Sequence, residues 1–402
     1  MNKNISALYE IAQKETRKII GLMSGTSLDG LDIALCEISG AGGNTDVKIL
    51  EFETINYTED IKTEIRKVFA KKTIDFQHLA LLNEWIGILH ADMVNDCLQK
   101  WNIPANEVDL IASHGQTVLH APKFLHQQEK FPNATLQIGD GDHIAVKTGI
   151  ITLSDFRQKH VAAGGEGAPV AVYGDYLLFS KKGENRIMLN MGGIANFTYL
   201  PASLNASEVF VTDTGTANTL IDIYTKHYFP EKSYDKDAEI SQSGTVNQSL
   251  LSELKDNAFF TKSFPKTIGQ ELFNFDFVQN ALLKTGLGNI SAPDLLATLT
   301  RLSAETIAEA IGFVVKNTEI PIAAFTVYMS GGGANNPLLV RWLKELLPCD
   351  FQKSDDLGIA GDAKEAILFA ILANETVAGG DYNFGSKKGI PSVTMGKISF
   401  PD

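Results

Sequence analysis

Short apolar runs bounded by polar or glycine-rich turns alternate along this chain with longer segments in which apolar residues recur at helical spacing. Residues 18–23 and 31–38 are apolar runs on either side of a short glycine-containing turn, which predicts a β-hairpin. A further strand is expected over 46–57. Apolar residues at helical spacing over 76–101 predict a long helix, and residues 108–113 are typical of a short buried strand that ends before His114.

The second part of the chain follows a similar plan, with short buried strands that end in small or polar residues and helices between them. Strands are expected over 186–193, 194–200, 208–215 and 323–329, and helices over 217–229, 293–317, 337–347 and 365–377.

Strands that alternate with helices predict an α/β protein, and hairpins at the start of each half predict mixed sheets flanked by helices. A length of 402 residues is typical of two or three domains at about 150 residues each. We therefore expect two related lobes, residues 1–185 and 186–402, with a cleft between them. The last helix and the tail are candidates for crossing back to the first lobe.

The opening turn, within GLMSGTSLDGLD, resembles a phosphate-binding loop that has lost its lysine. Backbone N–H groups of Gly25, Thr26 and Ser27 would form an anion-binding concavity, and the two hydroxyls would add donors. Asp29 or Asp32 would meet Mg²⁺, usually through water. The alternative is a plain hairpin turn whose hydroxyls only cap backbone groups.

A second candidate is VTDTGTAN, in which Asp213 ends an apolar strand and is followed by Gly215 and a helix. Ligands of α/β proteins bind at strand ends, where a carboxylate is well placed to act as a general base. An N-cap of the following helix is the competing interpretation of Asp213.

Two glycine-rich turns also follow predicted strands. In MSGGGANN, three consecutive glycines after Ser330 would let a flat ring lie against bare backbone, although a loose connection remains open. Gly192 and Gly193 form a further strand-end pair that could serve only a tight turn.

Polar groups of the first half gather in SHGQT, DFRQKH and AAGGEGAP. Arg157 is the natural partner for a carboxylate on a substrate. His114 and His160 are either site residues or hydrogen-bonded structural histidines.

Composition narrows the function classes. A net charge of −13 and a pI near 5.1 disfavour nucleic acid as a partner and require a local device to hold any nucleotide. An N-terminal region without an apolar core, and the lack of 18 consecutive apolar residues, predict a cytoplasmic protein that does not meet the membrane. These features together favour a two-lobed nucleotide-binding phosphotransferase or ATPase.

Taken together, the motifs resemble those of the anhydro-N-acetylmuramic acid kinase family over residues 19–374, with PKTIGQELFN as a further match. The resemblance implies two ribonuclease-H-like lobes of the actin-like ATPase fold, with a central cleft for ATP and sugar. It also implies an activity: ATP and water convert 1,6-anhydro-N-acetylmuramic acid into N-acetylmuramic acid 6-phosphate and ADP, in cell-wall recycling. The alternatives are an actin- or Hsp70-like nucleotide switch and a conventional hexosamine kinase. A homodimer stays open.

The resemblance implies roles by position. Asp213 would be the catalytic base, Asp29 and Asp32 would meet Mg²⁺, and the sugar side would comprise His114, Arg157 and Glu365. The residues expected to bind ATP are Gly25, Thr26, Ser27, Leu28, Asp29, Gly30, Leu31, Asp32, Gly192, Gly193, Gly215, Ser330, Gly331, Gly332, Gly333 and Asn335. His160 and Glu166 depart from the commoner family pattern near the expected sugar pocket.

Overall fold

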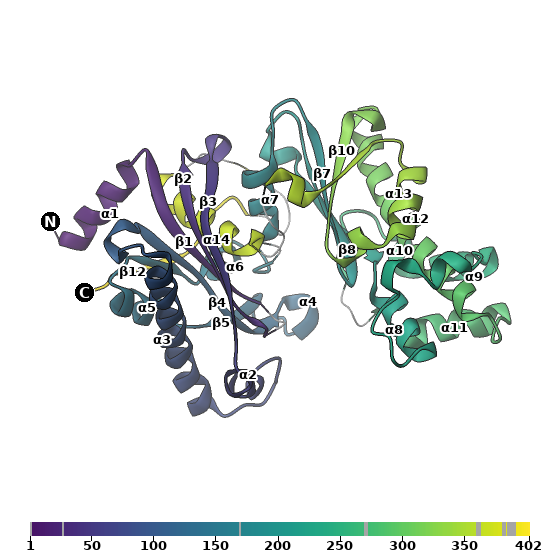
Figure 1. Ribbon diagram of the computed structural model, residues 1–402, viewed down its shortest axis with the longest axis horizontal. Coiled ribbons are helices and arrows are strands. Elements are labelled where there is room, and N and C mark those ends of the chain that lie inside the picture. The colour runs from purple at the N-terminus through teal and green to yellow at the C-terminus, as the bar shows by residue number, and fades with distance from the viewer. Residues whose placement is uncertain are drawn as a thin grey trace. The chain divides into compact units, whose positions relative to one another are not determined.

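The computed structural model describes residues 2–25, 28–168, 170–268, 272–358, 363–379, 383 and 391–402. The chain divides into two compact units, whose elements are labelled in Figure 1. The first unit comprises Met1–Phe179, Asn205–Ser207 and Asp362–Asp402, and the second comprises Ser180–Leu204 and Glu208–Gly361.

The first unit is built on a mixed sheet with the strand order β12-β6-β4-β1-β2-β3, and β5 pairs with β4. β1, β2 and β3 are antiparallel neighbours, whereas β4 is parallel to both β1 and β6. The strands are β1 (Thr16–Ser24), β2 (Gly30–Ser39), β3 (Asp46–Asn56), β4 (Leu110–Ala121), β5 (Ala134–Ile138), β6 (Thr152–Ser154) and β12 (Lys397–Ser399).

The second unit has a sheet with the order β11-β10-β7-β8-β9. Three antiparallel strands, β7 to β9, again come first, and β10 then lies parallel to β7 and β11. The strands are β7 (Asn185–Met191), β8 (Ile194–Leu200), β9 (Phe210–Thr216), β10 (Phe325–Ser330) and β11 (Asp350–Lys353). The prediction of an α/β fold with mixed sheets and one plan in both halves is therefore confirmed.

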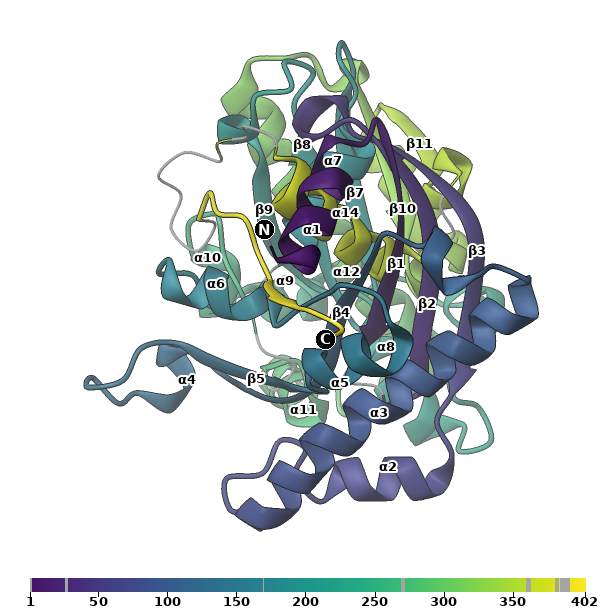
Figure 2. The ribbon, with the colours of Figure 1, turned by 90° about the vertical axis from the view of Figure 1, so that its left-hand side faces the viewer.

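Helices cover the first sheet on both faces. Those of the first unit are α1 (Lys3–Gln13), α2 (Glu59–Arg66), α3 (Phe76–Trp101), α4 (Lys123–His126), α5 (Gly141–Thr148), α6 (Phe156–Ala162), α7 (Ala171–Phe179) and α14 (Lys364–Ala378). Because side chains alternate along a strand, Ile20 and Leu22 of β1 face the core that α3 completes with Ile86 and Val94. Figure 2 shows α3 running across the strands of this sheet.

The opposite face of β1 receives α14, although α14 follows β1 by more than 300 residues in sequence. A Cβ on Gly21 would lie 1.9 Å from the carbonyl oxygen of Ala366, so only glycine permits this approach. Buried polar contacts fix the far end of α14. Arg17 Nε donates to Asn374 Oδ1 at 2.7 Å, and the Glu375 carboxylate accepts from the backbone N–H of Gly42 at 2.9 Å.

The second unit packs its sheet around the long α12, most of whose apolar residues are buried. Its helices are α8 (Thr219–Tyr228), α9 (Gln248–Lys255), α10 (Ala258–Thr261), α11 (Phe275–Thr285), α12 (Ala292–Thr318) and α13 (Pro337–Leu346). Leu189, Phe197 and Val327 of the sheet share a core with Ile307 and Ile311 of α12.

Two strands differ from expectation near candidate site residues. β4 does not end before His114 but continues to Ala121, and β9 runs three residues past Asp213 to Thr216. Both predictions of a strand end were wrong because buried polar residues continue each strand. Across the described part of the chain, no helix combines the length and apolar character needed to cross a bilayer.

Candidate functional site

The base of the opening loop is held by Ser24 and Gln116. Ser24 Oγ lies 2.6 Å from Gln116 Oε1, and Gln116 Nε2 donates to the carbonyl of Gly25 at 3.0 Å and to that of Thr117 at 3.1 Å. Two carbonyl acceptors fix the amide orientation, so Ser24 must donate to Oε1. Thr26 and Ser27 lie outside the described residues, and their expected role in phosphate binding stays a prediction.

A buried chain of hydrogen bonds continues from Ser24 into α3. Tyr57 Oη donates to Ser24 Oγ at 2.9 Å and lies 2.7 Å from His90 Nε2. Because the single phenolic proton goes to Ser24, His90 must donate through Nε2. Burial lowers the pKa of His90 to about 4, so this histidine is neutral near pH 7. Each donor in this series of hydrogen bonds therefore points the same way, from His90 of α3 through Tyr57 and Ser24 to Gln116 beside the opening loop.

The remaining loop residues differ in exposure. Asp29 is exposed, while Asp32 is partly buried and accepts from Thr54 Oγ1 at 2.6 Å. Leu28 is buried with a left-handed φ of 60°, and Leu31 is fully buried in the core of the first unit. Of these four, only the aspartates offer a side chain to a ligand, and Leu28 and Leu31 can contribute backbone alone.

Gly30 begins β2, next to β3. A Cβ at this position would lie 2.2 Å from the carbonyl oxygen of Ile55, so the residue serves the close approach of the two strands.

A β-bulge aims His114 away from the regular sheet. Pairing between β1 and β4 shifts from Leu22 with Ser113 to Ser24 with Gln116, so β4 holds one extra residue. Gly115 supplies the required φ of 75°. The sequence signal for this bulge was the glycine of SHGQT.

His114 and Arg157 form a buried pair. His114 Nδ1 donates to the Gly115 carbonyl at 2.8 Å, so Nε2 is unprotonated and accepts from Arg157 Nε at 2.9 Å. Burial, with Arg157 as the next influence, lowers the pKa of His114 to about 3 and keeps the ring neutral. His114 therefore orients the guanidinium and does not act as an acid.

Arg157 has guanidinium N–H donors that make no hydrogen bond within the described structure. Its Nη1 donates to the Gly167 carbonyl at 3.3 Å, so with the bond to His114 two of the five guanidinium donors are used within the described structure. The free donors suit a carboxylate or hydroxyl group of a ligand.

Glu365 lies in the first turn of α14. It is exposed to solvent, yet the surrounding protein makes desolvation the main influence and raises the pKa of its carboxyl. Arg157 and Lys364 act in the opposite direction, and Asp32 adds to the increase. Among the described residues Glu365 has no ion pair or hydrogen-bond partner. The first unit therefore places Asp32, Arg157 and Glu365 within electrostatic reach of one another.

His160 supports the loop backbone that follows α6. It is fully buried, and its Nδ1 accepts from the backbone N–H of Gly167 at 3.0 Å. A Cβ on Gly165 would lie 2.2 Å from its ring. His160 thus shapes the loop that carries Glu166, and its departure from the commoner pattern acts on that backbone.

Asp213 is the candidate base of the second unit. It lies within β9, beside a bulge at which Ala195 pairs with Gly215 and Asn196 pairs with Asp213. Asp213 Oδ2 accepts from the backbone N–H of Ile268 at 2.8 Å. Burial raises the pKa of Asp213 to about 6, although that N–H lowers it.

The hairpin tip of β7 and β8 carries Gly192 and Gly193. The side-chain amide of Asn218 donates to the Met191 and Gly192 carbonyls at 3.1 and 2.8 Å, and the N–H of Ala217 donates to the Gly193 carbonyl at 2.8 Å. The start of α8 thus closes over this tip.

The glycine loop after β10 lies beside the same tip, because Ser330 pairs with Asn190 in parallel register. A Cβ on Gly331 would meet Asn190 and Met191 at 2.8 Å, and one on Gly333 would meet Met191 at 2.7 Å. Packing alone therefore requires these two glycines.

Gly332 differs from Gly331 and Gly333, because a Cβ there would come no nearer than 3.6 Å, to the Asn218 amide. Asn335 accepts from Lys353 Nζ at 3.4 Å. Gly331, Gly332 and Asn335 are the exposed residues of this loop.

Sequence reasoning missed several supporting residues. Three of them, Gln116, Tyr57 and His90, are far apart in sequence and come together only in the folded structure. No local sequence pattern therefore indicates Tyr57 or His90. Gln116 lay within the SHGQT motif, which was the one available signal.

Carboxylates of raised pKa and glycine-rich strand ends are typical of α/β enzymes that act on small polar ligands. The family model described as anhydro-N-acetylmuramic acid kinase matches residues 17–399. The chain belongs to the anhydro-N-acetylmuramic acid kinase family.

Curated relatives agree along the full length. The anhydro-N-acetylmuramic acid kinase of Pseudoalteromonas atlantica is 54% identical, with 100% of both chains covered. That of Caldanaerobacter subterraneus is 38% identical, over 98% of this chain and 99% of the relative. A solved activator of the 2-hydroxyisocaproyl-CoA dehydratase from Clostridium difficile with bound ADPNP is 12% identical, covering 90% and 95% of the two chains with a TM-score of 0.38. That structural likeness is too small to bear on function.

Proposed function

We propose that the protein is an ATP- and Mg²⁺-dependent kinase that opens 1,6-anhydro-N-acetylmuramic acid with water and phosphorylates O6. The products are N-acetylmuramic acid 6-phosphate and ADP, and the reaction serves cell-wall recycling in the cytoplasm. Family membership over nearly the whole chain supports the substrate. The structural observation that carries the chemistry is Asp213, a partly buried carboxylate whose pKa is raised to about 6.

Asp213 is the base in this proposal. A pKa of about 6 leaves the carboxylate ionised at pH 7 but makes it a stronger base than an ordinary aspartate. It takes a proton from the water that attacks the anomeric carbon. The bond from that carbon to the bridging oxygen breaks, and the released O6 attacks the γ-phosphorus of ATP, with ADP as the leaving group.

The sugar side is assigned to the first unit. Arg157, held by neutral His114, has free N–H donors for the lactyl carboxylate of the substrate. Glu365 is exposed and without a partner among the described residues, so its carboxyl is free to meet sugar hydroxyls.

In each unit one loop is a candidate for binding the nucleotide. In the first, the opening loop, braced by Gln116, is proposed to hold the phosphates through backbone N–H groups. In the second, Gly332 and Asn335 are open to the adenosine. The carboxylates of Asp29 and Asp32 are oxygen ligands of the kind Mg²⁺ prefers, and the ion would neutralise phosphate charge.

The test is ADP release by the full chain with ATP, Mg²⁺ and one of three sugars: 1,6-anhydro-N-acetylmuramic acid, N-acetylmuramic acid or N-acetylglucosamine. We expect turnover with the anhydrosugar and formation of the 6-phosphate. Preference for a sugar with a free 6-hydroxyl would indicate a conventional hexosamine kinase instead. ATP hydrolysis that ignores all three sugars would indicate a nucleotide switch.

We also propose a homodimer. The arm formed by β4, β5 and α4, which extends from the rest of the first unit in Figure 2, exposes Phe124 and Phe131 at 55% and 51%. Lys123 and Lys130 flank these two rings on the same arm. Light scattering should give twice the chain mass, and the Phe124→Ser, Phe131→Ser double variant should give one chain mass. A single chain mass for the unaltered protein refutes the dimer.

A further inference from the structure

The PKTIGQELFN motif has no role in the function proposed above, yet its first residues run beside the strand that carries Asp213. The backbone N–H of Asp213 donates to the Lys266 carbonyl at 2.9 Å, and the N–H of Lys266 donates to Thr212 Oγ1 at 3.0 Å. Two residues on, the N–H of Ile268 reaches the Asp213 carboxylate. The placement of Ile268 therefore depends on how Lys266 is anchored.

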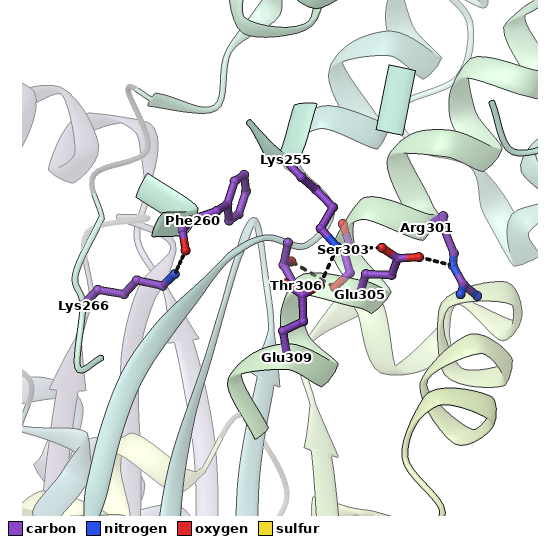
Figure 3. Close-up of polar contacts among 8 residues, drawn as sticks. All are labelled: Lys255, Phe260, Lys266, Arg301, Ser303, Glu305, Thr306 and Glu309. Atoms are coloured by element: carbon purple, nitrogen blue, oxygen red, sulfur yellow. Dashed lines mark hydrogen bonds and ion pairs between the residues drawn. The ribbon is translucent and has the colours of Figure 1, made fainter. Parts of the chain in front are cut away.

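Lys266 is anchored by its own side chain. The residue is only 7% exposed, and Nζ donates to the carbonyls of Phe259 and Phe260 at 3.3 and 3.4 Å. The ammonium also lies 4.5 Å from the ring centroid of Phe259 and 4.4 Å from that of Phe264. Figure 3 shows Lys266 pointing to the carbonyl of Phe260. We call these three phenylalanines and Lys266 the lysine cage.

The cage uses no direct carboxylate partner among the described residues. Glu309 of α12 acts on Lys266 from a distance, and Lys262 opposes it. Glu309 itself pairs with Lys255, which also pairs with Glu305 (Figure 3). An apolar side chain of equal length would fill the cage without the desolvation of an ammonium. It would not make the directional bonds that fix the segment against α10.

The cage also reaches the bulge of β9. A Cβ on Gly215 would lie 3.0 Å from the ring of Phe260 and 3.2 Å from Thr306 Oγ1. Phe260, whose carbonyl accepts from the ammonium, therefore covers with its ring the backbone two residues after Asp213.

We propose that Lys266 is a positioning residue of the reaction: its caged ammonium fixes residues 264–268 along β9, so that the Ile268 N–H holds the Asp213 carboxylate in place. The inference rests on the proposed role of Asp213 as the base. Lys266 does not touch the substrate in this scheme and acts only through the backbone.

The pH dependence of turnover separates this role from plain structural support. The influences on the pKa of Asp213 are burial, which raises it, and the Ile268 N–H, which lowers it. The charged groups on the neighbouring segments are Lys262, Lys266, Glu305, Glu309 and Lys255. If only the hydrogen bond from the Ile268 N–H is lost, the pKa of Asp213 rises, and the acid limb of the kcat profile moves to higher pH.

The experiment compares full-length wild type, Lys266→Met, Lys266→Arg and the control Lys262→Met, with kcat and KM measured across pH. For Lys266→Met we expect the acid limb to move up by about one pH unit. We expect kcat at pH 7 to fall about tenfold with KM for ATP within about twofold. Lys266→Arg, which keeps the cation, should move the limb less, and Lys262→Met should match wild type.

A second variant covers the case in which Lys266→Met does not fold. Phe264→Leu removes one wall of the cage but keeps the ammonium, and it should move the limb in the same direction by a smaller amount. An acid limb unchanged in every folded cage variant would overturn the proposal, even if stability fell.

Failure of the proposed function would be visible separately, because wild type would not turn over the anhydrosugar. The cage is then tested by titrating ¹³C-carboxyl aspartate signals, with the Asp213 signal assigned by its loss in Asp213→Asn. A higher titration midpoint in Lys266→Met supports the positioning role, and an unchanged midpoint refutes it.

Discussion

Replacement of Asp213 by asparagine should lower turnover sharply and stabilise the fold. Asparagine has the same shape, and its Oδ1 can still accept from the Ile268 N–H. The variant loses the base, so kcat should fall by about 10²–10⁴-fold. ATP binding should remain, because the residues assigned to the nucleotide are unaltered.

The stability gain follows from the pKa of Asp213, which rises from 3.8 to about 6 on folding. A tenfold change in proton affinity corresponds to about 1.4 kcal/mol, so the ionised carboxylate costs at most about 3 kcal/mol. Partial exposure of Asp213 screens this charge, and about 1–2 kcal/mol is the expected cost. Because the folded-state pKa is raised, the cost is present above pH 6 and absent below 3.8.

Thermal and urea unfolding of wild type and Asp213→Asn provide the assay, at about pH 8 and about pH 5. At the higher pH the variant should melt roughly 2–8 °C above wild type, and the gap should narrow at the lower pH. A variant that is less stable at the higher pH, or a gap independent of pH, would refute the account of a carboxylate strained by burial. Undiminished turnover would remove Asp213 from the role of base.

Three further outcomes are expected. Tyr57→Phe leaves the Nε2–H of His90 without its acceptor, so the free energy of unfolding should fall by about 1–3 kcal/mol and KM for ATP should rise. An unchanged melting temperature would contradict the series of hydrogen bonds from His90 to Ser24. Glu365→Gln should raise KM for the anhydrosugar about tenfold while KM for ATP stays constant, and equal effects on both substrates would argue against a sugar contact. Chelation of Mg²⁺ should stop ADP release, and Asp32→Asn should raise the Mg²⁺ concentration needed to restore it; an unchanged Mg²⁺ requirement would exclude Asp32 as a ligand of the ion.

Much of the fold follows from local periodicity. The helix predicted over 76–101 matches α3, and the opening hairpin matches β1 and β2, because each buries an unbroken apolar face. The shared plan of the two sheets was also visible, since strand order follows from hairpins and crossover helices.

The errors fall where strands bury polar residues. β4 continues through His114 and Gln116, and β9 continues past Asp213, because neighbouring strands and side chains satisfy the polar groups. Bulges at Gly115 and Gly215 also shift the register, and a period-two pattern does not survive an inserted residue. The short strands β5, β6, β11 and β12 carry too few residues to show any period.

The candidate site also has a part that the sequence predicts and a part that it does not. Motif loops such as SHGQT and DTGT could be picked out from their residue types, but the partners that orient them could not. The bond from Arg157 to His114, or from Ile268 to Asp213, joins residues more than 40 positions apart. Such pairings depend on tertiary packing, which a single sequence does not display.

The return of α14 to the first sheet has a consequence for biosynthesis. During translation, roughly 10–40 s separate the emergence of α7 from that of α14 at ordinary ribosome speeds. Throughout that interval the face of β1 around Gly21 has no helix against it, and Arg17 lacks Asn374. The N-terminal half can therefore finish folding only after nearly the whole polypeptide has been made, and products that stop short of α14 should be cleared as incomplete. Glu365, which we propose to contact the sugar, arrives with that last helix, when the nascent chain is almost ready for release.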